Sequence, residues 1–326
     1  MSILHRWAAL GLAAVAAASA AAEFDLQGHR GTRGLAPENT MAAFQRALAV
    51  GVTTLETDLA VTKDGIVVIA HDPLLNPDLV RGPDGKWLAA KGPPIRTLTF
   101  AELQQYDIGR TNPASAYAKQ FPEQQAADGQ RFPALADLLA LGAGNTVRFA
   151  LETKITPTSG ADTPDPAAFA RLAIDVVRNM GALQRVSILS FDWRTLVEVK
   201  KLAPEVPTVC VTIESQNLDT VQRHAAAGSP WHAGLRLAAH GGSLPRLVKA
   251  AGCSTWSVFW RNLTPELVAE AHAQGLLVTP WTVNEPADMT RLVGWGVDGI
   301  ITDYPDRLRK VLAEKGMPLP TGDGTQ

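Results

Sequence analysis

The sequence has few cysteines and no excess of basic residues. Its 326 residues contain only two cysteines, Cys210 and Cys253, and their spacing matches no cysteine-based metal site. Both lie in or beside predicted core strands, which favours two buried thiols, although export would make a disulfide chemically possible. The 30 Lys and Arg residues are balanced by 32 Asp and Glu residues, a formal net charge of −2. Nothing therefore indicates a polyanion such as nucleic acid as the partner.

Nucleotide-binding loops and long apolar runs are also missing. No GxGxxG or Walker sequence follows any predicted strand, which argues against a nucleotide-binding sheet. Beyond the first residues, no run is long and apolar enough to cross a bilayer, so we expect no stable membrane insertion. Hydrophobic residues make up 46% of the chain and charged residues 19%. This composition supports a substantial core and argues against disorder.

The first 22 residues have the pattern of a secretory signal peptide. His5 and Arg6 form a short polar start, and an apolar, alanine-rich run follows at 7–18. Small residues at 18–22 provide cleavage sites, and the run is too short for a membrane span. The alternative is a retained N-terminal helix. We therefore expect a periplasmic or secreted protein, with one domain at 23–315 and a flexible tail at 316–326.

Predicted strands and helices alternate along most of the remaining chain. The strands are predicted at 24–27, 52–61, 147–151, 186–191, 208–213, 255–260, 276–281 and 299–302. The helices are predicted at about 40–50, 99–106, 134–141, 166–180, 193–202, 218–227, 244–251, 265–274, 287–294 and 307–314. Eight strands alternating with helices predict an α/β fold, a closed (β/α)8 TIM barrel in one domain. An open doubly wound sheet is the alternative.

A hairpin and a long irregular segment follow the second strand. Residues 66–70 are predicted to run back along 52–61 after the turn at 62–65, which returns His71 to the strand end that holds Glu56. A two-residue loop places His71 opposite Glu56, whereas a bulged loop, favoured by Gly65, places it opposite Thr57. Periodicity then fails from 73 to 133. Because long irregular insertions are usually functional or mobile, we expect 73–133 to form a cap over the site.

Three carboxylates lie at the ends of predicted strands, where a barrel carries its active site. Glu56 and Asp58 are two residues apart and point to the same face, and Glu152 ends a different strand. Inward carboxylates at this spacing need a shared proton or a cation. Three of them, with open water positions, suit one hard divalent cation, Ca²⁺ or Mg²⁺. The alternative is a solvated acidic rim.

Candidate acid, base and phosphate-binding groups lie at the same strand ends. His29 and Arg30 follow the first strand between two glycines, which allow close approach of a ligand. Arg30 can bind a phosphate bidentately. Together with His71 and a cation, these residues form a set suited to phosphoryl transfer.

Two further residue types complete the candidate pocket. Lys154 lies two residues after Glu152 and can bind a phosphate oxygen, although a simple salt-bridged strand end is the alternative. Trp281 and Trp260 follow later strands and are candidates for the pocket wall. For both tryptophans, a place in the core is the alternative.

Several strings along the chain resemble those of glycerophosphodiester phosphodiesterases of the secreted or periplasmic bacterial type. The likeness covers nearly the whole mature chain, and its first block is the most specific. The matching strings are His29-Arg30-Gly31, Pro37-Glu38-Asn39-Thr40, Phe44, Gly51, Glu56-x-Asp58, Thr62-x-Asp64-Gly65, His71-Asp72, Glu152-Thr153-Lys154, Ser190-Phe191-Asp192, Trp281-Thr282-Val283-Asn284 and Gly299-Ile300-Ile301-Thr302-Asp303-Tyr304-Pro305.

The resemblance implies a metal-dependent hydrolase with a TIM barrel and an insertion after the second strand. It implies glycerophosphodiesters such as glycerophosphocholine or glycerophosphoethanolamine as substrates, and sn-glycerol 3-phosphate and an alcohol as products. The implied roles are acid and base, in either order, for His29 and His71; ligands of one divalent cation for Glu56, Asp58 and Glu152; and substrate contacts for Arg30, Lys154 and Trp281.

One segment departs from the family pattern, and two other functions compete with this interpretation. Many members carry an arginine and threonines shortly after the second histidine, whereas residues 73–78 read Pro-Leu-Leu-Asn-Pro-Asp. The resemblance therefore does not extend to head-group contacts from this loop. The competing functions are a related barrel phosphodiesterase acting on lysophospholipids and a periplasmic protein that binds phosphodiesters without cleaving them. A purely structural barrel is least favoured, because it leaves the inward carboxylates without a partner.

Overall fold

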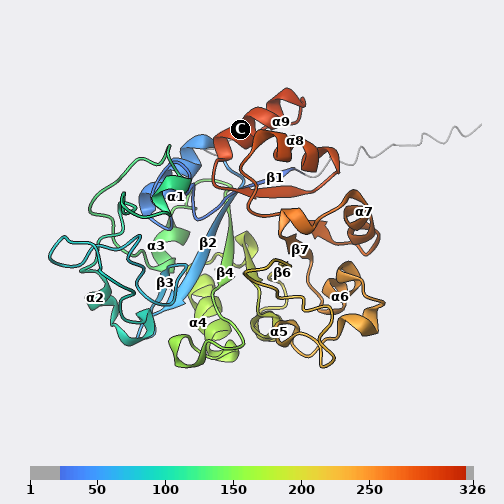
Figure 1. The fold of residues 1–326 in the computed structure, drawn as a ribbon, viewed down its shortest axis with the longest axis horizontal. Helices are drawn as coiled ribbons and strands as arrows, with labels where there is room; N and C mark the ends of the chain where they lie inside the picture. Colours follow the sequence, from blue (N-terminus) through green and yellow to red (C-terminus); the bar gives the residue numbers. More distant parts are fainter. Residues whose placement is uncertain (1–22, 321–326) are drawn as a thin grey trace, which may run out of the picture.

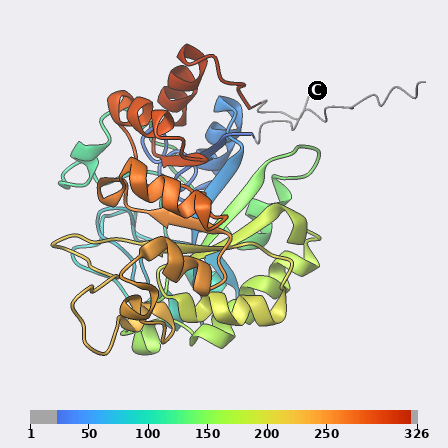
Figure 2. The ribbon, with the colours of Figure 1, turned by 90° about the vertical axis from the view of Figure 1, so that its right-hand side faces the viewer.

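A barrel of parallel strands forms the centre of the protein, and helices surround it (Figure 1, Figure 2). The computed structural model describes residues 23–320. The barrel strands are β1 (Asp25–Gly28), β2 (Thr54–Val61), β4 (Arg148–Thr153), β5 (Val186–Ser190), β6 (Thr208–Thr212), β7 (Thr255–Val258), β8 (Leu277–Val278) and β9 (Gly299–Thr302). Their order in the sheet is β8-β7-β6-β5-β4-β2-β1-β9. The predicted (β/α)8 barrel is confirmed.

The barrel closes between β8 and β9 through separate backbone hydrogen bonds. Asp298 N donates to Val278 O and Ile301 N donates to Pro280 O, each at 3.0 Å. On the other side of β9, β1 pairs with it in register, so that Gly28 lies beside Thr302. The last strand therefore places the residues that follow it next to the residues that follow the first strand.

Nine α-helices lie in the described part of the chain, and polar caps or prolines start most of them. They are α1 (Met41–Val50), α2 (Phe100–Leu103), α3 (Leu135–Ala140), α4 (Pro166–Asn179), α5 (Trp193–Leu202), α6 (Leu244–Ala250), α7 (Pro265–Ala273), α8 (Pro286–Gly294) and α9 (Pro305–Glu314). Thr40 caps α1 by accepting a hydrogen bond from Ala43 N, and Gly51 ends the helix at φ 88°. Among residues 23–320, no helix is long and apolar enough to cross a membrane.

The helix predicted at 218–227 is wrong. The connection from β6 to α6 runs over 213–243 without an α-helix and contains only short 3-10 turns. Asp219 accepts hydrogen bonds from the backbone N–H groups of Val221 and Gln222, and the Ser215 hydroxyl accepts one from Leu218. These side chains satisfy the backbone locally and compete with helical hydrogen bonds.

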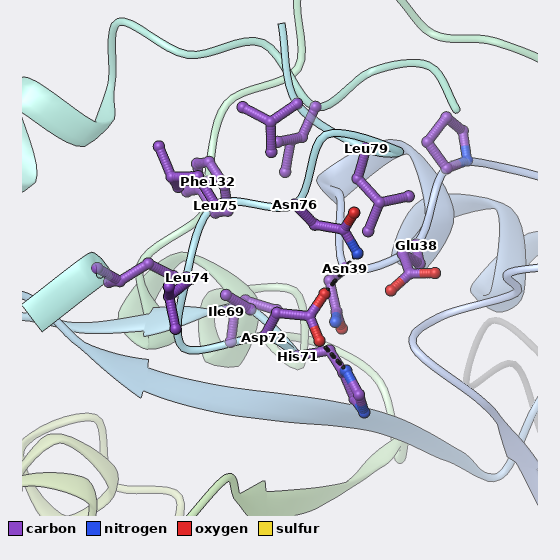
Figure 3. Close-up of a pocket in the computed structure, with 15 residues that line it drawn as sticks. Glu38, Asn39, Ile69, His71, Asp72, Leu74, Leu75, Asn76, Leu79 and Phe132 are labelled. Atoms are coloured by element: carbon purple, nitrogen blue, oxygen red, sulfur yellow. Dashed lines mark hydrogen bonds and ion pairs between the residues drawn. The ribbon is translucent and has the colours of Figure 1, made fainter. Parts of the chain in front are cut away.

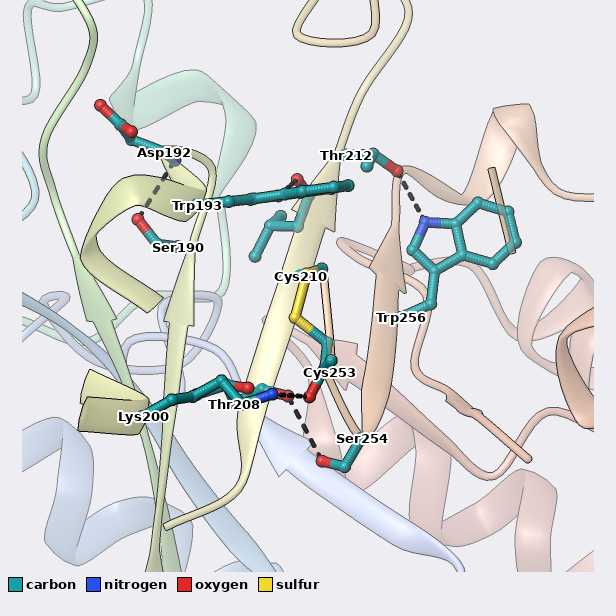
Figure 4. The surroundings of a disulfide bond; sticks show 12 residues. Ser190, Asp192, Trp193, Lys200, Thr208, Cys210, Thr212, Cys253, Ser254 and Trp256 are labelled. Atoms are coloured by element: carbon teal, nitrogen blue, oxygen red, sulfur yellow. Dashed lines mark hydrogen bonds between the residues drawn. A yellow bond between two sulfur atoms is a disulfide. The ribbon is translucent and has the colours of Figure 1, made fainter. Parts of the chain in front are cut away.

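The expectation of two free thiols is also wrong, because Cys210 and Cys253 form a disulfide (Figure 4). Both cysteines are buried as predicted. However, β6 and β7 are neighbouring strands, and Cys253 lies just before β7, with a Cα–Cα distance of 5.9 Å to Cys210. This separation lies within the range that a disulfide spans. Burial was readable from the local pattern, whereas the adjacency of the two strands was not.

The hairpin after β2 forms in the favoured register. Strand β3 (Val67–Ile69) pairs antiparallel with β2, with Leu59 opposite Ile69. Continuing this register places His71 opposite Thr57, as the bulged turn with Gly65 at φ 82° requires. Ala70 N donates to Asp58 O at 3.0 Å, so His71 lies at the end of β2 that carries the carboxylates.

Residues 73–133 lie beside this hairpin and contain α2 and several turns. They contribute Leu75, Val80, Ile95 and Leu103 to a small apolar cluster that also includes Val68 of β3. Their role as a cap stays a prediction. The predicted signal peptide and residues 321–326 of the predicted tail lie outside the described residues.

Candidate active site

The three predicted carboxylates meet at the carboxyl ends of two neighbouring strands. Glu56 and Asp58 come from β2 and Glu152 from β4, and the parallel register sets Asp58 beside Glu152. All three side chains are buried, with one oxygen from each within 4.8 Å of the others. They therefore form an inward acidic cluster and not a solvated rim.

The electrostatics of this acidic cluster favour a bound cation. Burial raises the pKa of Glu56 well above its usual range, and the charges of Asp58 and Glu152 add to the rise. Burial also raises the pKa of Asp58, but the charges of Arg30 and Lys154 outweigh it, so the net shift is downwards. Because carboxylate oxygens are the preferred ligands of Ca²⁺ and Mg²⁺, these residues fit a divalent cation.

Arg30 and Lys154 border the acidic cluster and are paired with its carboxylates. Arg30 Nη1 lies 2.6 Å from Glu38 Oε1, and Arg30 Nε lies 3.1 Å from Asp58 Oδ2. Lys154 Nζ lies 2.7 Å from Glu152 Oε1 and 3.6 Å from Asp58 Oδ1. Both side chains thus place positive charge beside the acidic cluster.

The backbone of Arg30 is part of the same arrangement. Its φ of 50° is in the left-handed region, which costs free energy for a residue other than glycine. In this conformation Arg30 N donates to Glu56 Oε2 at 2.9 Å. Strained backbone of this kind is concentrated at functional sites.

His29 has one ring nitrogen paired and the other facing the acidic cluster. Its Nδ1 donates to Asp303 Oδ1 at 2.7 Å, and its Nε2 lies 3.9 Å from Glu56 Oε2. Burial, reinforced by the charge of Arg33, lowers the pKa of His29 to about 4, although Asp303 opposes the shift. A neutral His29 that donates through Nδ1 carries a lone pair on Nε2, so this atom is able to accept a proton.

Asp303 has a direct contact with His29 that sequence reasoning missed. It accepts hydrogen bonds from Arg33 and from Asn284 Nδ2, and its side chain is fully buried. The residue was visible only within a longer string of the family resemblance. The signal that would have found it is barrel closure: β9 pairs with β1, so the residues after these strands, Asp303 and His29, become neighbours.

His71 is less buried than His29. Its Nδ1 donates to Asp72 Oδ1 at 2.8 Å, and Asn76 Nδ2 in turn donates to Asp72 Oδ2 at 2.6 Å (Figure 3). Burial and the charge of Arg30 lower the pKa of His71, and the charge of Asp58 opposes this. Each histidine is therefore oriented by its own aspartate.

The two histidines line different but neighbouring cavities. A small cavity inside the barrel mouth is lined by His29, Glu56, Glu152 and Trp281. His71 lies at the edge of a second cavity, whose other walls are mainly apolar side chains of the insertion (Figure 3). The hairpin brings the two cavities near each other, because Ala70 N donates a hydrogen bond to Asp58 O and His71 is the next residue.

The two candidate tryptophans have different positions. Trp281 lines the cavity with His29 and packs against Phe191 and Phe259, with ring centroids 5.3 and 5.7 Å away. Trp260 lies outside that cavity and stacks with Arg261 and Arg291. Of the two candidate tryptophans, Trp281 is therefore the one that lines the cavity with His29.

A known family matches most of the described chain. The profile of the glycerophosphoryl diester phosphodiesterase family matches residues 29–307, a range that begins at His29 and includes every site residue discussed above. The chain belongs to this family. Its members are enzymes, and the chain is accordingly a phosphoric diester hydrolase.

Relatives and solved structures agree with this assignment. A glycerophosphodiester phosphodiesterase of Caldanaerobacter subterraneus subsp. tengcongensis is 30% identical over 292 residues, which cover 88% of this chain and 97% of the relative. A Silicibacter pomeroyi crystal structure assigned to the same family is 34% identical with a TM-score of 0.80, covering 91% of this chain and 95% of that one.

A second solved structure shows the same fold in complex with a small molecule. It is an Oleispira antarctica phosphodiesterase solved with the product sn-glycerol-3-phosphate. It is 22% identical, has a TM-score of 0.64 and covers 88% of this chain and 96% of that one.

Proposed function

We propose that this enzyme hydrolyses glycerophosphodiesters such as glycerophosphocholine or glycerophosphoethanolamine to sn-glycerol 3-phosphate and an alcohol, using one divalent cation, Ca²⁺ or Mg²⁺. The observation that carries the proposal is the buried cluster of Glu56, Asp58 and Glu152 beside a histidine–aspartate pair. The family supplies the substrate class, and the product found in the Oleispira relative supports it.

The acidic cluster is the proposed binding site of the cation. When bound, the ion neutralises the carboxylates and the phosphodiester and polarises a phosphoryl oxygen. Arg30 and Lys154, held beside Asp58, bind the remaining phosphate charge. Trp281 forms the wall of the cavity and helps to exclude water.

His29 and His71 are the proposed acid and base, in either order. One histidine removes a proton from the nucleophile, and the other protonates the leaving alcohol. Attack by water gives sn-glycerol 3-phosphate directly, whereas attack by the adjacent glycerol hydroxyl gives a cyclic phosphate that a water molecule must then open. Each ring donates through Nδ1 to an aspartate, so Nε2 is the atom that exchanges the proton. This arrangement gives both rings a fixed tautomer.

The assay that tests this function follows choline and sn-glycerol 3-phosphate release from glycerophosphocholine. Lysophosphatidylcholine, assayed in parallel, separates this function from that of a lysophospholipid-specific phosphodiesterase. Tight binding of glycerophosphocholine with added Ca²⁺ or Mg²⁺ but without product would instead indicate a binding protein.

Replacing Asp303 with asparagine is expected to lower kcat by about ten- to a hundredfold, the usual range for partners that orient catalytic or metal-bound groups. The new amide side chain would keep the volume but would not fix the His29 tautomer, and Arg33 would lose its ion pair. Steady-state kinetics with glycerophosphocholine measure the effect. An unchanged kcat in a folded Asp303→Asn variant would show that the His29–Asp303 contact has no part in turnover.

We also propose that the protein is exported and that residues 1–22 are removed. The signal-peptide pattern supports export, and so does the Cys210–Cys253 disulfide, because such bonds persist in oxidising compartments. Expression of the full chain in a Gram-negative host should give a periplasmic protein that begins near Glu23 and has no free thiol in a mass spectrum. A cytoplasmic protein with an intact N-terminus and two free thiols would contradict the proposal.

A further inference from the structure

Tyr117 comes from the insertion, yet its hydroxyl lies between two residues that lead to the active site. The hydroxyl donates to Glu38 Oε2 and accepts a hydrogen bond from Arg33 Nη1 at 3.0 Å. Glu38 and Arg33 belong to the loop after β1, about eighty residues earlier in the chain. One phenol therefore joins the insertion to the loop that carries His29 and Arg30.

The contact with Glu38 leads to the acidic cluster. Glu38 is buried, and its Oε1 accepts a hydrogen bond from Arg30 Nη1 at 2.6 Å. Arg30 Nε in turn lies 3.1 Å from Asp58 Oδ2. Tyr117 thus holds the carboxylate that sets the position of the Arg30 guanidinium.

The contact with Arg33 leads to the first histidine. Arg33 Nε and Nη2 donate to the two oxygens of Asp303 at 2.8 and 3.0 Å. Asp303 then accepts the hydrogen bond from His29 Nδ1 at 2.7 Å. The same hydroxyl therefore ends two chains of charged hydrogen bonds, one leading to a predicted metal ligand and one to a predicted acid or base.

The segment that carries Tyr117 is fastened to this loop by further contacts. Gln124 Nε2 donates to Arg33 O at 2.7 Å, and Gln125 N donates to Leu35 O at 3.0 Å. The Arg33 guanidinium lies 4.7 Å from the centroid of the Phe121 ring, which packs edge-on against Tyr117. These contacts give the phenol a defined position, as a positioning role requires.

We infer that Tyr117 is a positioning residue that holds Arg30 and the His29–Asp303 pair in their working geometry. The inference rests on the proposed function of that site. Without the hydroxyl, the buried carboxylate of Glu38 and the partly buried guanidinium of Arg33 each lose a partner, and both side chains are then free to shift. Outer residues of this kind typically change metal affinity or activity by about ten- to a hundredfold.

Tyr117→Phe tests this role, because it removes the hydroxyl and keeps the ring that packs on Phe121. Tyr106→Phe is the matched control: it lies in the same insertion, is half-buried, and its hydroxyl has no hydrogen-bond partner among the described residues. With glycerophosphocholine, Tyr117→Phe should lower kcat at least tenfold with KM within about twofold, and Tyr106→Phe should match the wild type. Equal kcat for the two variants would overturn the inference.

A double-variant comparison guards against a general loss of structure. Glu38→Gln should lower kcat in the same way. The double variant Glu38→Gln with Tyr117→Phe should lower kcat by less than the product of the two separate fold-decreases, since both changes interrupt the same series of hydrogen bonds. Effects that multiply independently would overturn the inference.

Calorimetric titration with Ca²⁺ provides a readout independent of turnover. The Tyr117→Phe variant should bind Ca²⁺ about tenfold more weakly than the Tyr106→Phe variant, because an Arg30 that a displaced Glu38 no longer holds is free to pair more closely with Asp58 and to compete with the ion. Equal affinities would count against the role. If the wild type cleaves no glycerophosphodiester, the proposed function fails, and this titration still decides whether Tyr117 organises the acidic cluster.

Discussion

Replacing His29 with alanine should lower kcat for glycerophosphocholine by about 10²–10⁴-fold, the usual contribution of a general acid or base. His29 Nε2 faces the acidic cluster, and its Nδ1 is fixed by Asp303. The change removes the proton-transfer group and leaves the three carboxylates in place. Purified variant and wild type are compared by steady-state release of sn-glycerol 3-phosphate.

His224→Ala is the control for this measurement. His224 is exposed, and its side chain makes no hydrogen bond to a site residue among residues 23–320. Its replacement should leave kcat unchanged. A His29→Ala variant that turns over like His224→Ala, with melting temperatures equal to that of the wild type, would exclude His29 as acid or base.

The second large effect is expected for Asp58→Asn. Asp58 is one of the three clustered carboxylates and also lies against Arg30 and Lys154. The variant loses a charged metal ligand, and the positive charges of Arg30 and Lys154 are then less well neutralised. We therefore expect loss of Ca²⁺ or Mg²⁺ binding and at least a hundredfold lower kcat/KM. Calorimetric titration and steady-state kinetics report the two losses separately.

Thermal unfolding provides a further test of the same substitution. A cation that binds only the folded state stabilises it by about 2.7 kcal/mol at a hundredfold excess over Kd. The wild type should therefore melt at a higher temperature with Ca²⁺ or Mg²⁺ than with EDTA, and Asp58→Asn should show no such difference. Asp175→Asn, an exposed change on α4, should behave like the wild type. A metal-induced rise that persists in Asp58→Asn would contradict the assigned site.

Much of the site could be predicted because it depends on local patterns. The spacing of Glu56 and Asp58 places both side chains on one face of a strand, and that strand is in fact the neighbour of the one ending in Glu152. The turn at 62–65 returns His71 to the same strand end, and Gly65 favours the register that places it opposite Thr57. Each of these inferences uses residues close together in the sequence.

The features that were missed depend on contacts between distant segments. Asp303 reaches His29 only because the last strand closes the barrel against the first. Tyr117 reaches Glu38 only through the course of an irregular insertion, which has no periodicity to interpret. The disulfide depends on the same kind of contact, between β6 and the residue just before β7.

A different cause explains the wrong helix at 218–227. The segment has helix-compatible composition, but Asp219 and Ser215 bind nearby backbone N–H groups and stabilise turns. The prediction therefore followed the spacing of the apolar residues and took no account of the polar side chains that compete for the backbone N–H groups.

The central claim is that this barrel mouth binds a divalent cation and cleaves a glycerophosphodiester there. The most direct test measures sn-glycerol 3-phosphate and choline release from glycerophosphocholine by the mature protein, after EDTA treatment and after Ca²⁺ or Mg²⁺ is added back singly. We predict no release with EDTA and restored release with at least one of these ions. Release that is undiminished by EDTA, or no release with either ion, would contradict the claim.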